Sequence, residues 1–119
     1  MELWKLRQEV DRLKQRDDRR AIDTGIGQLR TIYDKIQDTI LLGKKTEEFG
    51  VRGEVAVVKG LLGLWKELLD DVMQRMKEEA TNTPKYAEFL NITGQVLEER
   101  NEELWCDFYE LEFQSLMFG

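Results

Sequence analysis

Apolar residues recur at alternating steps of three and four along the middle of the chain. This heptad spacing places them on one face of a helix, where they meet another helix. Leucines beside them widen the apolar face, while lysines and acids occupy the opposite one. We call this set the seam: Val55, Val58, Leu62, Trp65, Leu69, Val72 and Met76. It predicts a central helix over residues 47–79 that packs against other helices.

Two shorter apolar registers precede the seam, one over residues 3–13 and one over residues 22–40. Leu13, the last member of the first register, and Ile22, the first member of the second, are nine residues apart, whereas a continuous heptad pattern requires seven. At 100° per residue, the extra two residues turn the second apolar stripe by about 200° relative to the first on a straight helix. The intervening Asp-Thr-Gly-Ile-Gly segment, residues 23–27, offers a capping residue and two glycines that weaken a helix. We therefore expect a kinked or broken helix over residues 2–42, with segments 2–22 and 26–42.

Residues that typically cap or begin helices mark the remaining helix ends. Gly43 before two lysines is typical of a helix C-terminus, and Thr46 before two glutamates is typical of the next N-terminus. Thr83 followed by Pro84 is a favoured helix start. The last helix is expected over residues 84–116. Asn101 interrupts its apolar stripe, and it either fixes the helix register at a cost in stability or lies on the rim.

The end of this last helix is unusually aromatic. Five aromatic residues fall within residues 104–118: Trp105, Phe108, Tyr109, Phe113 and Phe118. They point all round a helix, so one partner helix cannot cover them. Either they dock into the chain's own core, or they anchor the chain on another subunit, since aromatic residues dominate interface hot spots.

The composition agrees with a helical protein and limits its chemistry. Of 119 residues, 41% are hydrophobic, 35% are charged and one is proline, which helix interiors exclude. There is no histidine and only Cys106, which rules out imidazole ligands, an internal disulfide and a thiolate metal cluster. The glutamates at 98, 99, 102 and 103 favour a solvated acidic face over a di-metal site, which also requires histidine.

Charge is distributed unevenly around a net −6. Residues 1–52 carry 12 basic and 10 acidic residues, whereas residues 53–119 carry 6 and 14. An acidic chain repels nucleic acid unless a basic patch is segregated, and the basic residues between positions 5 and 20 are interleaved with acids. The asymmetry favours head-to-tail contact between copies, or a basic protein partner. No signal peptide or membrane helix is expected.

The segment Arg52-Gly53-Glu54-Val55, followed by Val58 and Leu61-Leu62, resembles small helical accessory proteins of tailed bacteriophages. In that family a similar turn begins a helix that carries a leucine pair. The resemblance implies a virion or assembly component.

These patterns predict an all-α protein, with three or four long helices in an antiparallel, partly coiled-coil bundle that forms a single domain over residues 1–119. We expect no catalytic, cofactor or metal site. We expect a non-enzymatic structural or assembly protein, in a virion or in the cytoplasm, whose seam and terminal aromatic residues contact other copies or subunits. The alternative is an acidic regulatory protein that masks a basic surface on an enzyme or a nucleic-acid-binding partner.

Overall fold

The computed structural model describes residues 3–16, 20–45 and 52–118. Four α-helices account for nearly all of them: α1 (Leu3–Gln15), α2 (Arg20–Lys45), α3 (Arg52–Asn82) and α4 (Ala87–Phe118). A short 3-10 turn, η1 (Pro84–Tyr86), lies between α3 and α4. The described residues contain no strand, so the predicted all-α bundle is confirmed.

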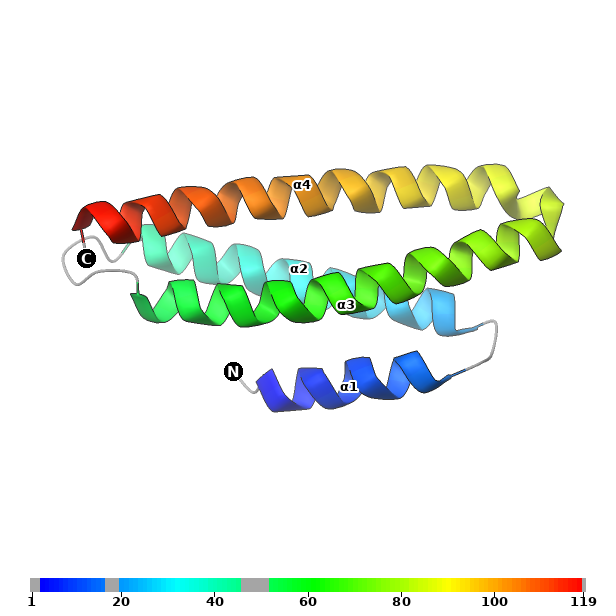
Figure 1. Cartoon of the computed structure of the whole chain (residues 1–119), viewed down its shortest axis with the longest axis horizontal. Helices are drawn as coiled ribbons and strands as arrows, with labels where there is room; N and C mark the ends of the chain where they lie inside the picture. The colour runs from blue at the N-terminus through cyan, green and yellow to red at the C-terminus, as the bar shows by residue number, and fades with distance from the viewer. Residues whose placement is uncertain (1–2, 17–19, 46–51, 119) are drawn as a thin grey trace.

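Successive helices run in opposite directions along the long axis of the molecule (Figure 1). As a result α2 and α4 run parallel to each other, and both lie against α3. The shorter α1 lies on α3 and α2, on the side away from α4 (Figure 1). The helix α3 is therefore the centre of the bundle, because every other helix packs against it.

The seam supplies the centre of the core. Six of its seven residues are at most 7% exposed, and Val55 is partly buried against the same cluster. The core draws on all four helices, with Val10 from α1, Ile36 from α2 and Leu104 from α4 among its buried side chains. Burying an aliphatic side chain of this size contributes about 1.5–3 kcal/mol, so this cluster is the main source of stability.

The break in the N-terminal helix lies earlier than we predicted. The helix α1 ends at Gln15, and α2 runs without interruption from Arg20 to Lys45, through the segment 23–27. Gly25 does not break α2, because it faces the core: a Cβ atom there would lie 2.5 Å from Cγ2 of Val72. The glycine instead allows α2 and α3 to approach closely.

Gly43 also lies inside a helix and does not end it. It is buried within α2, and a Cβ atom there would lie 2.8 Å from Cδ1 of Leu111 in α4. The predicted N-cap at Thr46 and the first residues of the predicted central helix, 47–51, lie outside the described residues. From Arg52 onward the central helix is present, and it extends to Asn82.

The predicted start of the last helix is confirmed at Pro84. Thr83 is the N-cap residue, Pro84 begins the 3-10 turn, and α4 continues from it. The backbone N–H of Tyr86 donates to the carbonyl of Thr83 over 3.0 Å. The Thr83 hydroxyl lies 2.9 Å from Glu79 Oε1 and donates to it, so it ties the turn back to the end of α3.

Candidate protein-interaction site

The residues predicted to contact other subunits fall into two groups in the structure. The seam packs against the chain's own helices and is not an exposed surface. The physical reason is that heptad spacing specifies a helix partner but not the chain that supplies it. A surface that receives another protein must therefore be sought among the exposed apolar residues.

The C-terminal aromatic residues divide between core and surface. Phe108 is buried, and Trp105 is half-buried against the core. Tyr109 and Phe113 are exposed, whereas the side chain of Phe118 lies outside the described residues. The segment therefore docks partly into the chain's own core, and it leaves Tyr109 and Phe113 uncovered by the described helices.

The exposed members form a continuous strip along the outside of α4, which we call the aromatic stripe: Trp105, Tyr109, Phe113, Leu116 and Met117. Apart from half-buried Trp105, its side chains are 58–80% exposed. The first three residues are four apart, so they follow one another up one side of the helix. The rings of Trp105 and Tyr109 have centroids 5.8 Å apart, which fixes one end of the stripe against the core.

Carboxylates surround the stripe. Beyond Arg100, α4 carries no basic residue, and its acids are Glu102, Glu103, Asp107, Glu110 and Glu112. On the side that faces α2, three of them are bonded: Tyr33 donates to Glu103 over 2.9 Å, Gln37 donates to Asp107 over 3.1 Å, and Lys44 lies 3.5 Å from Glu110. Burial, together with the hydrogen bond to Glu103, raises the pKa of Tyr33.

Sequence reasoning missed a second exposed apolar set, at the opposite end of α4. Phe89, Ile92 and Val96 are 45–68% exposed. Phe89 and Val96 directly precede the buried residues Leu90 and Leu97. Because successive residues are 100° apart around a helix, the exposed set lies about 100° from the row of leucines that α4 buries. The spacing of three and then four residues between its members was the available signal.

A shallow groove beside this set lies between α2 and α4. Its apolar lining includes Ile26, Leu29, Val96 and Leu97, and its volume is about 390 Å³. Arg30, Asp34 and Arg100 line it as well. Arg100 donates to Glu103 over 3.2 Å, and this hydrogen bond raises the pKa of the guanidinium.

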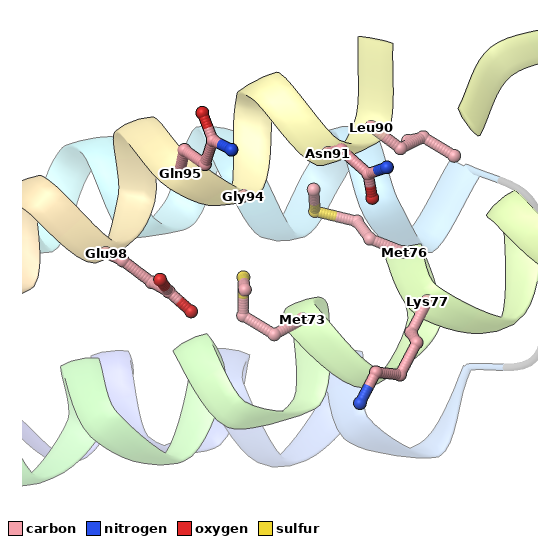
Figure 2. A pocket seen from close by; sticks show the side chains of 8 residues that line it. All are labelled: Met73, Met76, Lys77, Leu90, Asn91, Gly94, Gln95 and Glu98. Carbon is pink, nitrogen blue, oxygen red and sulfur yellow. The ribbon is translucent and has the colours of Figure 1, made fainter. Parts of the chain in front are cut away.

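A second hollow, of about 310 Å³, lies between α3 and α4 where the two helices approach η1 (Figure 2). Two methionines, Met73 and Met76, project into it from α3, and Gly94 of α4 forms part of its wall. A Cβ atom on Gly94 would lie 3.3 Å from Cε of Met73, so the glycine leaves room for the thioether. Lys77, Asn91, Gln95 and Glu98 line it as well, so the hollow combines apolar walls with two amides and one charge of each sign.

The described residues hold no group of three or more acidic or cysteine side chains placed to bind a metal ion. No helix in the described ranges is long and apolar enough to cross a membrane. Comparisons of the chain with protein-family models, with curated proteins and with solved structures give no match.

Proposed function

We propose that this protein is a non-enzymatic structural protein that assembles with copies of itself through the aromatic stripe. One observation carries the proposal: the chain packs its seam against its own helices, yet leaves Tyr109, Phe113, Leu116 and Met117 in solvent. Contiguous exposed apolar patches on soluble proteins commonly mark interaction sites. Large aromatic anchors contribute most of the binding energy at such sites.

The proposal places the protein in a bacteriophage particle, as the resemblance at residues 52–62 implies. A helical bundle with a terminal docking surface suits a repeated subunit, because each copy then offers the same contact to its neighbour. Mass spectrometry of purified particles from the source would test this part, and absence of the chain from them would contradict it.

Self-association is tested by sedimentation equilibrium of the purified chain and of the variant Tyr109→Asp/Phe113→Asp. We expect the wild type to form oligomers and the variant to be monomeric, because two carboxylates would have to be desolvated in the contact. Gln95→Asp is the matched control, since it adds an acid to an exposed position of the same helix outside the stripe.

A wild-type chain that stays monomeric at about 1 mM would overturn the proposal. At that concentration even a contact worth only about 4 kcal/mol would be substantially formed. Circular dichroism of both variants should match the wild type, because the substituted side chains are exposed.

An acidic regulatory protein is the second candidate, and the exposed carboxylates of α4 favour it. Glu98, Glu99 and Glu102 are all exposed, and Glu98 and Glu102 are one turn apart. A contact made through them would weaken steeply as salt is raised, because exposed charges are screened. A contact made by the aromatic stripe should persist in 1 M salt, so the salt dependence of binding separates the two functions.

A further inference from the structure

We propose that the aromatic stripe of one copy docks in the groove between α2 and α4 of a second copy, so that the chains assemble head to tail. This inference rests on the self-association proposed above and names the surface that receives the stripe. We call that surface the acceptor groove: Ile26, Leu29, Arg30, Val96 and Leu97, extended along α4 by Ile92 and Phe89.

Among the described residues, the side-chain bonds between α2 and α4 lie toward their C-terminal halves, and the acceptor groove lies beside the first of these bonds. Tyr33–Glu103, Gln37–Asp107 and Lys44–Glu110 join the two helices there. In the described part of the chain, no side-chain hydrogen bond or ion pair joins α2 to α4 before Tyr33. The groove of about 390 Å³ is bounded at this first bridge by Tyr33 and Arg100 and continues toward Ile26. Its lining, to which Trp65 of α3 also contributes, is mainly apolar.

The carboxylates beside the stripe disfavour a contact in which the stripes of two copies pair with each other. In a symmetric contact the same surface patch meets itself, so the carboxylates beside each stripe would face their own copies. Like charges placed opposite each other at an interface cost several kcal/mol. After Arg100, α4 contains no basic residue that could reduce this repulsion between the acids.

The acceptor groove offers charge of the opposite sign. Two guanidinium groups line it, those of Arg30 and Arg100, against a single carboxylate, that of Asp34. Arg100 is already paired with Glu103. Within the ranges that the structure describes, Arg30 makes no hydrogen bond or ion pair, so its charge is available to an incoming acid such as Glu102.

The other basic surface of the chain, the outside of α1, fits the stripe less well. Its positive charge is already partly neutralised, since Arg7 pairs with Asp11 and Glu67, and Arg12 pairs with Glu9 over 3.0 Å. Among the described residues of α1, one large apolar side chain is well exposed, that of Trp4. The groove side of α4 presents three such side chains in a row: Phe89, Ile92 and Val96.

Along α4 the stripe occupies residues 105–117, at the C-terminal end of the helix, whereas the acceptor groove uses residues 89–97, nearer its start. Leu97 and Trp105, the members nearest in sequence, are eight residues or about 12 Å apart along the helix. Each copy that uses its stripe therefore keeps its groove for the next copy. A contact between two different surfaces produces either a closed ring or an open chain, depending on the rotation between neighbours.

Mixing two variants, each defective in one surface, tests the proposal. Phe113→Asp removes the stripe and keeps the groove, and Val96→Asp removes the groove and keeps the stripe. We expect each variant alone to be monomeric in sedimentation velocity. Mixed in equal amounts, they should form a dimer and no larger species, because one intact stripe meets one intact groove.

A charge variant tests the groove without touching its apolar wall. Arg30→Glu should weaken assembly at least about tenfold at low salt, and the difference should shrink at high salt. Glu102→Lys in the partner copy should restore part of the loss. Arg12→Glu is the matched control, because it makes the same change on exposed α1, and it should leave assembly unchanged.

The results separate this proposal from the one it rests on. If Phe113→Asp abolishes assembly while Val96→Asp and Arg30→Glu leave it intact, the stripe is received elsewhere: the acceptor groove is excluded and self-association stands. If the mixture of monomeric variants forms no dimer, the head-to-tail arrangement is excluded. A monomeric wild type overturns both proposals.

Discussion

Two glycines in α2 that look equivalent in the sequence have opposite roles in the structure. A Cβ atom on Gly25 would lie 2.5 Å from Val72, whereas a Cβ atom on Gly27 would meet nothing within 4 Å. Composition and spacing suggest only that both weaken the helix. Their difference depends on which side of α2 the neighbouring helix occupies.

Alanine substitutions should separate these two roles. We expect Gly25→Ala to destabilise the protein by about 1–3 kcal/mol, because overpacking against Val72 outweighs the better helix propensity of alanine. Gly27→Ala, its matched control in the same helix, should stabilise it by up to about 1 kcal/mol. Urea denaturation measures both, and two changes of the same sign would contradict the packing assigned to Gly25.

Asn101 is the second residue whose role the structure decides. Its Oδ1 accepts a hydrogen bond from the indole N–H of Trp65 over 3.0 Å, between α4 and α3. Trp65 is almost wholly buried, so this N–H has no access to bulk water. Asn101 therefore lies at the contact between two helices and not on the rim. The hydrogen bond fixes the axial position of α4 relative to α3.

Removal of that acceptor should be costly. We expect Asn101→Leu to destabilise the protein by about 1–3 kcal/mol, because it leaves the buried N–H of Trp65 without a partner. Trp65→Phe removes the donor, so the double variant should be more stable than the sum of the two losses predicts, by about 0.5–3 kcal/mol. Strictly additive losses in denaturant titrations would show that the hydrogen bond contributes nothing.

At the scale of elements, α1 differs from the other helices in how it is attached. Of the described helices it contacts α3 and α2 alone, and it buries Leu6, Val10 and Leu13 against them. Its C-terminal carbonyls, those of Leu13 and Lys14, accept hydrogen bonds of 3.2 and 3.1 Å from the guanidinium of Arg75. Arg75 is held in turn by Asp71, one turn earlier on α3, over 2.9 Å. A cation at this end also complements the helix dipole.

The Arg75 contact should determine how often α1 detaches. We expect Arg75→Ala to cost about 1–3 kcal/mol and to speed hydrogen exchange in α1 more than in α4, because charged donors to these carbonyls are lost. Arg12→Ala should change stability by less than about 0.5 kcal/mol, because its pair with Glu9 is exposed and only one turn apart. Equal effects of the two variants on α1 exchange would show that Arg75 does not hold this helix.

As a whole, the molecule is a rod and not a sphere. Its extents are 53 × 26 × 15 Å, and its Cα radius of gyration is 16.1 Å. A compact chain of this length would have a radius of gyration of about 13.5 Å. Long helices that lie side by side produce this shape, and they also separate the aromatic stripe from the acceptor groove.

Small-angle scattering should detect assembly as an increase in the radius of gyration. At low concentration we expect a radius of gyration near 16 Å, the value of one copy. At higher concentration it should rise as copies join end to end, and Phe113→Asp should remove the rise. A value that is independent of concentration for the wild type would contradict head-to-tail growth.

The sequence by itself determined the helical class, the central seam, the start of the last helix at Pro84 and the exclusion of histidine chemistry. These follow from periodicity, from turn chemistry and from composition, which are local properties of the chain. Periodicity could not decide whether the seam faces the same chain or another one, because a heptad stripe fits any helix. Only the tertiary structure assigned the seam to the chain's own core, turned Gly25 and Gly43 from breaks into close contacts, and left the aromatic stripe and the acceptor groove uncovered. Burial depends on which helices lie side by side, and that depends on the whole chain at once.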